Sequence, residues 1–298
     1  FCGEQAHRAA ASFAQQRFWF LTEFGGSNSA FNITEIHRLK GPLDLAALEN
    51  VLNEMVRRHS VLRTTFEVVD GVPQQRIAAT LRVPLPMEDL SGLPAADREA
   101  QRKAGLYTET RRPWSLSEGP VIRARVWRLD ANDHQLIVLM HHIVSDGWSQ
   151  GLFVRELAAL YDAYSHGRPS PLPELPIQYS DFAVWQRQWA SSPEFDRQME
   201  YWKAVLQDPP VLQLPAVRSA LVAPEPGRGT HKRFFLSREL SRDLRASCQA
   251  EGVTVYMAML AAFAILLYRY SGQDDIVIGS PVANRDRPEV EGLIGSFM

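Results

Sequence analysis

The sequence predicts an α/β protein built as two lobes, of which the second is incomplete. Segments with helical spacing alternate with short apolar segments through the first half, and this alternation is typical of α/β proteins. A proline-rich stretch at 166–177 then interrupts the pattern, which resumes from residue 232. We therefore expect a first lobe at 1–168, and a linker with part of a second lobe at 169–298.

The first predicted helix covers residues 45–58, because apolar residues recur there at helical spacing and Asp44 can cap its start. A β-hairpin follows, with strands at 62–69 and 73–77 joined by an Asp-Gly turn. These elements already mix the two periodicities that an α/β lobe requires.

Residues 98–111 have the pattern of a polar helix, and residues 121–129 alternate as a strand does. The next strand, 134–141, is a nearly continuous apolar run, which indicates burial on both of its faces. A helix at 149–165 follows it directly, so this strand leads through a short turn into a helix.

Beyond the proline-rich stretch, the patterns predict helices at 180–190, 193–206, 238–250 and 254–270, and strands at 232–236 and 275–279. The longest apolar run, Val253–Tyr268, is shorter than the roughly 18 residues that a membrane span needs, so we expect a buried core helix and no membrane partner. No secretory signal begins the chain. It begins without methionine and stops after an apolar run, so we expect a piece of a longer protein.

The composition excludes several functional classes. The chain has 32 basic and 34 acidic residues, and this balance gives no electrostatic basis for binding nucleic acid. Cys2 and Cys248 lie far apart and lack metal-ligand spacing, so we expect neither a disulfide framework nor a zinc site. Two thiols in a chain of this size are typical of a cytoplasmic protein.

The strongest functional signal lies between the buried strand and the helix that follows it. His141 and His142 end the strand, and Asp146 and Gly147 form the turn. Reactive groups in α/β proteins gather at such strand-to-helix turns. Adjacent strand residues face opposite ways, so we expect one histidine in a cavity and the other in a structural role. Gly147 permits close approach of a ligand, and amides at the helix start can face an oxyanion.

Other interpretations of this turn use the same residues. Both histidines could be hydrogen-bonded core residues, with Asp146 as a helix cap. A metal site would need a third ligand, which the local sequence does not supply, so we expect no metal. A serine nucleophile would be Ser145 or Ser149, but neither lies in a Gly-x-Ser-x-Gly elbow.

The turn resembles the His-His-x-x-x-Asp-Gly signature of the condensation domains of nonribosomal peptide synthetases, which belong to the chloramphenicol-acetyltransferase-like superfamily. Further segments resemble that family's other motifs and occur in the family's order, at residues 12–21, 58–66, 179–186 and 278–295. The motifs extend over essentially the whole chain. Most of their residues have a structural interpretation: the aromatic ones as core packing, and Arg17 and Arg63 as surface or ion-pair residues that could alternatively line a tunnel.

The resemblance implies a pseudo-dimer of two α/β lobes with mixed sheets and a tunnel between them. Donor and acceptor peptidyl carrier domains would insert phosphopantetheine arms from its two ends, so the domain itself would bind no cofactor. The amine of an aminoacyl thioester would attack an acyl or peptidyl thioester and form an amide. A neighbouring adenylation domain is also implied. The family's domains usually continue beyond the fifth motif, where this chain ends, so we expect residues 1–298 to be inactive alone.

Roles within the motif follow from the resemblance. We expect His142 and Gly147 to be catalytic, with His142 as a base or a positioning group. His141 and Asp146 would support the site, and Asp146 would pair with Arg285 of the fifth motif through a two-hydrogen-bond fork. Trp148 and Ser149 are further tunnel candidates.

Two alternatives within the same fold remain open. One is an epimerisation domain, although its motif usually places Ser before Trp, whereas here Trp148 precedes Ser149. The other is a non-catalytic domain that recruits carriers or accessory proteins. The motifs favour an L-configured donor and acceptor, but a fatty acyl donor remains open and neither substrate is identified.

Overall fold

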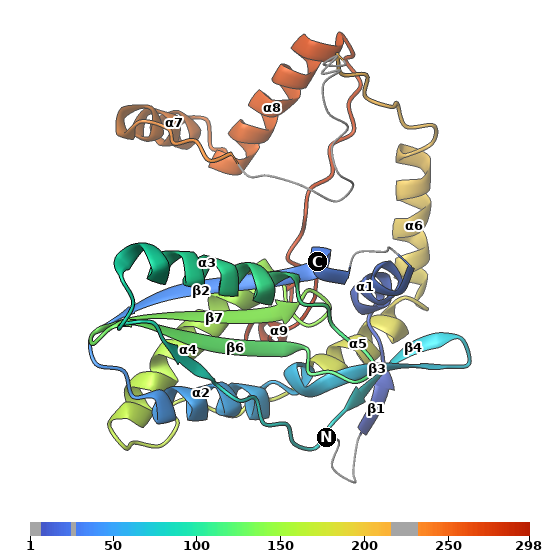
Figure 1. The fold of residues 1–298 in the computed structure, drawn as a ribbon. Coiled ribbons are helices and arrows are strands. Elements are labelled where there is room, and N and C mark those ends of the chain that lie inside the picture. The colour runs from blue at the N-terminus through green and yellow to red at the C-terminus, as the bar shows by residue number, and fades with distance from the viewer. Residues whose placement is uncertain (1–6, 25–27, 216–231) are drawn as a thin grey trace. The chain divides into compact units, whose positions relative to one another are not determined.

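The computed structural model describes residues 7–24, 28–215 and 232–298. These form two compact units (Figure 1). The first contains the chain up to Asp196 together with Val282–Met298, and the second runs from Arg197 to Pro281. The C-terminal segment therefore packs with the first unit. This is a division by packing, and the expected lobes at 1–168 and 169–298 remain a prediction.

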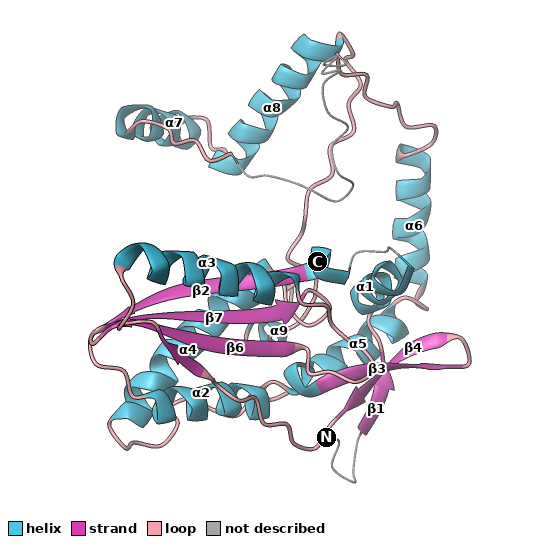
Figure 2. Ribbon diagram, in the orientation of Figure 1, coloured by secondary structure: helices cyan, strands magenta, loops and turns pink. Residues whose placement is uncertain are grey.

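The larger sheet of the first unit is mixed, and the histidine turn follows the end of one of its two inner strands. Its strands are ordered β2 (Asn32–Lys40), β7 (Asp133–His141), β6 (Ile122–Asp130) and β5 (Met87–Asp89) (Figure 2). β5 runs parallel to β6, and the other neighbouring pairs are antiparallel. Every residue of β7 after Asp133 is buried, which confirms the prediction of a strand covered on both faces.

The smaller sheet has the order β1 (His7–Ala10), β4 (Val72–Ile77) and β3 (Thr64–Val69). The predicted hairpin is confirmed, and its turn residues Asp70 and Gly71 both have positive φ, at 51° and 77°. The first strand begins two residues later than predicted, because Ser60–Arg63 form a 3₁₀ turn (η2) instead. Sequence patterns did not predict β1, β2 or β5.

The helices of the first unit are α1 (Phe13–Phe24), α2 (Leu45–Arg58), α3 (Ala95–Arg111), α4 (Gly147–Ser165), α5 (Tyr179–Trp189) and α9 (Pro288–Glu291), with a 3₁₀ turn η1 (Asn28–Phe31). Asp44 caps α2 as predicted, accepting a hydrogen bond from Ala47 N at 2.9 Å. α2 and α4 pack against each other, and their apolar residues join those of β6 and β7 in one core.

The helices α6 (Pro193–Val205), α7 (Arg238–Ala250) and α8 (Val255–Ser271) confirm the predicted helices beyond the boundary. The strands predicted at 232–236 and 275–279 are wrong, since the structure gives these residues no ladder. β-branched and aromatic composition alone cannot form a strand without a neighbouring edge to bond. The expected burial of Val253–Tyr268 is also wrong, because α8 has no buried residue. Among the described residues no single helix is long and apolar enough to cross a membrane, although α7 and α8, bent by 104°, pass that test as a pair.

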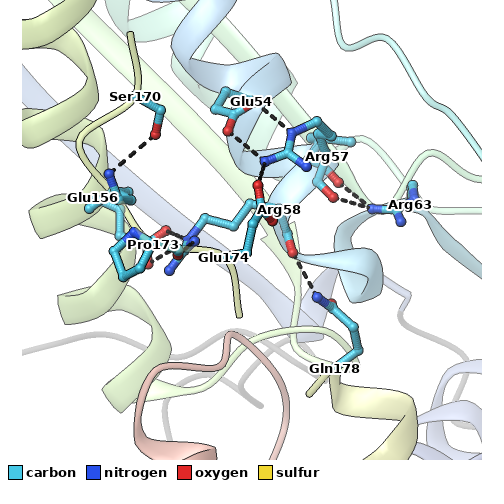
Figure 3. Close-up of polar contacts among 11 residues, drawn as sticks. Glu54, Arg57, Arg58, Arg63, Glu156, Ser170, Pro173, Glu174 and Gln178 are labelled. Atoms are coloured by element: carbon cyan, nitrogen blue, oxygen red, sulfur yellow. Dashed lines mark hydrogen bonds and ion pairs between the residues drawn. The ribbon is translucent and has the colours of Figure 1, made fainter. Parts of the chain in front are cut away.

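A buried charge cluster joins α2, α4 and the proline-rich stretch. The Arg58 Nε lies 3.1 Å from each carboxylate oxygen of Glu156, and Arg58 Nη1 donates to the carbonyl of Pro173 (Figure 3). His59 Nε2 lies 2.7 Å from Glu156 Oε2. The neighbouring Arg57 points instead to Glu54 and Glu174 at the surface. Arg58 and His59 thus have structural roles, and no local sequence pattern indicated their partner on α4.

We expect Glu156→Leu to lower the free energy of unfolding by about 3–5 kcal/mol, because it leaves the Arg58 guanidinium buried without its carboxylate. Adding Arg58→Met should recover much of that loss, since a buried ion pair is often no better than apolar residues of similar volume. Urea unfolding of the purified protein measures both. Arg57→Gln is the control, and removing its exposed pairs should cost less than about 1 kcal/mol. Equal effects of Glu156→Leu and Arg57→Gln would contradict this account.

Candidate active site

The histidine turn connects the central strand to the helix behind it. β7 ends at His141, and α4 begins at Gly147. His142 N donates to the carbonyl of Phe31 at 2.9 Å, and Val144 N donates to the carbonyl of His141 at 3.0 Å. These backbone bonds fix where each imidazole can lie.

His141 is completely buried and fully hydrogen-bonded. Its Nδ1 accepts from Ile143 N at 3.1 Å, so the ring proton belongs on Nε2, which lies 3.2 Å from Thr22 Oγ1. Thr22 in turn donates to the carbonyl of Phe18 at 2.7 Å. Burial, with the neighbouring His142, lowers the pKa of His141 to about 3. His141 is therefore neutral at physiological pH, and its two nitrogens hold α1 and the turn in place.

His142 has a different environment. Its ring is partly exposed and stacks on Phe18 with centroids 4.5 Å apart and planes inclined by 19°. Its Nδ1 is buried and has no hydrogen-bond partner among the residues that the structure describes. The two imidazoles are not hydrogen-bonded to each other within that part of the chain. Of the two, His142 is the one with a ring nitrogen that no described residue engages.

Asp146 is completely buried and each of its carboxylate oxygens has a partner. Oδ1 accepts from Ser149 N at 2.8 Å, so the residue is the N-cap of α4. Oδ2 accepts from Phe297 N at 3.1 Å. The side chain therefore joins the start of α4 to the C-terminal segment.

Arg285 lies beside Asp146, as the resemblance implied, but the contact is not a two-hydrogen-bond fork. Its Nη2 lies 3.4 Å from Asp146 Oδ1 and 2.9 Å from Ser149 Oγ. Its Nη1 donates to the carbonyls of Val290 and Leu293 at 2.6 and 2.7 Å. Asp146 already accepts from two backbone amides, so the guanidinium is shared between the carboxylate, a hydroxyl and two carbonyls. Burial lowers the pKa of Arg285, and the nearby Asp146 opposes that shift.

Ser149, Trp148 and Gly147 lie at the start of α4. The Ser149 hydroxyl donates to the Gly295 carbonyl at 2.9 Å and accepts from Gly295 N at 3.1 Å and from Arg285. With its oxygen engaged in this way, Ser149 holds the C-terminal segment and is not placed as a nucleophile. Trp148 Nε1 donates to the Glu291 carbonyl at 3.1 Å. A Cβ on Gly147 would make an ordinary van der Waals contact with Met298 Cε, at 3.7 Å, so a small side chain would fit at this position.

Arg17 and Arg63 occupy different places. Arg17 Nη2 donates to the Met298 carbonyl at 3.0 Å, and its guanidinium lies 5.1 Å from the centre of the Phe18 ring that supports His142. Arg63 instead donates to the carbonyls of Val56, Arg57 and Ala78 at 2.7–2.8 Å. Arg17 therefore belongs to the surroundings of the histidine turn, whereas Arg63 holds the end of α2.

Sequence reasoning missed the supporting residues Thr22, Phe31 and Tyr179. Tyr179 donates to the Ser296 carbonyl at 2.5 Å and accepts from Ser12 at 2.7 Å, which links the first motif to the C-terminal segment. Ser12 and Tyr179 begin motifs of the sequence, and that was the only signal of their proximity. Within the described residues, no three His, Cys, Asp or Glu side chains gather as metal ligands.

Comparisons with known proteins show which family the chain resembles. A sequence model of the condensation domain matches residues 5–298. Chondramide synthase of Chondromyces crocatus is 44% identical over 285 residues, which cover 96% of this chain and 7% of that protein. Phosphinothricin tripeptide synthetase of Streptomyces viridochromogenes is 42% identical over 289 residues, covering 96% and 26%. The chain thus spans about a quarter or less of the length of these relatives.

Solved structures show the same fold. The first condensation domain of the calcium-dependent antibiotic synthetase, in complex with a substrate analogue, matches with a TM-score of 0.78 at 24% identity, covering 98% of this chain and 68% of that chain. The X-domain from teicoplanin biosynthesis matches with a TM-score of 0.81 at 26% identity, covering 99% and 65%. On the strength of the family match and the identity to the synthetases, the chain belongs to the condensation domain family of nonribosomal peptide synthetases.

Proposed function

We propose that this domain joins a carrier-bound acyl or peptidyl thioester to the amine of a carrier-bound aminoacyl thioester, forming an amide bond. The observation that supports this most is the contrast between the two histidines. His141 is neutral, buried and engaged through both nitrogens, while His142 is partly exposed and its buried Nδ1 has no partner among the described residues. One imidazole is thereby left for chemistry, on a ring that Phe18 holds in place.

The reaction needs a proton acceptor at one stage. The acceptor amine attacks the thioester carbonyl, an N–C bond forms, and the carbonyl π electrons move to oxygen. His142 takes a proton from the positively charged nitrogen of this intermediate. The C–S bond then breaks, and the donor arm leaves as a thiolate that takes up a proton. An unperturbed α-amino group has a pKa of about 7.7–8.0, so part of the amine is neutral before attack.

The start of α4 provides a second element. The first N–H groups of a helix have no intrahelical acceptor, and Asp146 uses that of Ser149, which leaves those of Gly147 and Trp148. In this proposal these two N–H groups stabilise the developing oxyanion. Much of the rate acceleration would come from holding two tethered reactants together.

The partners follow from the family. Donor and acceptor peptidyl carrier domains bring the thioesters on their own phosphopantetheine arms, and an adenylation domain supplies the amino acid. Support comes from the relatives, which are synthetases several times longer than this chain. No cofactor is assigned to this domain.

A second candidate function is recruitment of an accessory protein. It is supported by the likeness to the teicoplanin X-domain, which has also been solved in complex with OxyB, at a TM-score of 0.75 and 25% identity. The free imidazole of His142 favours catalysis over this alternative. An epimerisation role is less favoured, because Trp148 precedes Ser149 and Ser149 is bound to Gly295.

His142→Ala should abolish most product formation while the protein stays folded, because no other described imidazole is available at the turn. The measurement is the intact mass of an acceptor carrier after mixing with a loaded donor carrier and the protein that contains this domain. His166→Ala is the matched control, since His166 lies exposed at the far end of α4. Wild-type yield from folded His142→Ala would exclude the catalytic role and favour recruitment.

Arg285→Ala and Asp146→Ala should each destabilise the protein by about 3–5 kcal/mol, because each leaves buried polar partners unsatisfied. Activity should fall with them through displacement of the turn. Asp146→Asn separates the two effects, since its amide oxygen can still cap α4 at Ser149. Chemical denaturation and the same carrier assay measure the outcome. If Asp146→Asn were fully stable yet inactive, Asp146 would be a catalytic group and the structural role would be wrong.

A further inference from the structure

The C-terminal segment is fastened to α4 at two separate points. At the start of the helix, Asp146 and Ser149 bind Phe297 N and Gly295. Further along α4, Glu156 binds His59, and His59 reaches back to the segment, where Ile294 N donates to its Nδ1 at 3.4 Å. The second connection, from Glu156 through His59 to Ile294, has no part in the proposed mechanism.

The hydrogen-bond partners of its two ring nitrogens determine the protonation state of His59. The Glu156 carboxylate can only accept from Nε2, so Nε2 bears the ring proton and Nδ1 is left as an acceptor for the Ile294 amide. Burial lowers the pKa of His59, although its bond to Glu156 acts in the other direction. Protonation of Nδ1 would set two donors against each other, so the geometry agrees with a neutral ring.

Glu156 holds this ring firmly because it is itself fixed. Its carboxylate accepts from Arg58, which is anchored to the Pro173 carbonyl (Figure 3). Burial raises the pKa of Glu156, but the bond to His59 and the Arg58 charge outweigh it and lower the pKa overall. Glu156, His59 and the Ile294 amide therefore form a rigid connection from the middle of α4.

We propose that His59 is a positioning residue for the reaction at His142, acting by fixing the backbone of Ile294. After Ile294, Gly295 N donates a hydrogen bond to Ser149 and Phe297 N donates one to Asp146. The position of this backbone therefore determines the position of the turn that carries His142. This inference rests on the proposed function for its kinetic consequence. Its structural consequence, protection of the Ile294 and Phe297 amides, is independent of any activity.

Two substitutions of the same residue separate the two nitrogens of His59. His59→Gln places an amide near Nε2 and keeps a contact with Glu156, but leaves the Ile294 amide without its acceptor. His59→Asn places an oxygen near Nδ1 and keeps that acceptor. We expect His59→Gln to lower kcat roughly tenfold or more with KM unchanged, because small misplacement of reacting groups has large effects on rate. His59→Asn should retain most of the wild-type kcat.

The rates are to be expressed per folded molecule, with the folded fraction taken from near-ultraviolet circular dichroism. Hydrogen–deuterium exchange should rise at Ile294 and Phe297 in His59→Gln alone, without acceleration in the core strand β7. Arg57→Gln is the control for a nearby surface change and should alter neither readout. Glu156→Gln is a further variant in case the His59 variants fold poorly, since its amide oxygen still accepts from His59 Nε2. It should be less stable but keep kcat within about twofold and leave exchange at Ile294 unchanged.

The outcomes are distinct. Wild-type kcat and exchange in His59→Gln, or equal impairment of His59→Gln and His59→Asn, would overturn the positioning role. Loss of folded protein with unchanged kcat per folded molecule would show that His59 is structural only. If the wild-type protein forms no amide, the proposed function fails, and the exchange pattern alone then decides whether His59 fixes the segment.

Discussion

The geometry of the histidine turn depends on one buried carboxylate, that of Asp146. One of its oxygens caps α4, and the other accepts the amide of Phe297, which is far away in sequence. A buried carboxylate without donors is costly, so the turn and the C-terminal segment must be in place together. Arg285 adds to this by binding Ser149 and the carbonyls of the segment. The geometry of the site therefore depends on contact between the start of α4 and the C-terminal segment.

The two adjacent histidines lie in different surroundings, and the separate roles that we propose for them rest on this difference. Both ring nitrogens of His141 are hydrogen-bonded, one to the amide of Ile143 and the other to the hydroxyl of Thr22, and burial keeps the ring neutral. His142, one residue further, has left the strand and stacks on Phe18, and its buried Nδ1 has no partner among the described residues. A general base needs a ring nitrogen that is not already engaged, which is why the proposed mechanism uses His142 and not His141.

Sequence reasoning succeeded where a local pattern determines the structure. The buried strand β7, the Asp44 cap and the Asp70-Gly71 hairpin follow from burial, capping and turn preferences. It failed where the partner lies far away in sequence. The residues predicted as strands at 232–236 and 275–279 form no ladder with any described residue, and α8 is apolar but not buried. In the site, family resemblance predicted that Arg285 lies beside Asp146. It did not predict that the Arg285 guanidinium also binds Ser149 and two backbone carbonyls, or which residues Glu156 and Tyr179 contact, because no local pattern contains these contacts.

The central claim is that His141 is a fixed neutral residue and so leaves His142 as the working imidazole. Nitrogen-15 NMR of the histidine rings over pH 8 to 5 tests this directly, because nitrogen shifts distinguish the two tautomers from the protonated ring. With a pKa of about 3, His141 should keep its proton on Nε2 and show no titration over that range. Titration of His141 in this range, or a proton on its Nδ1, would contradict the account.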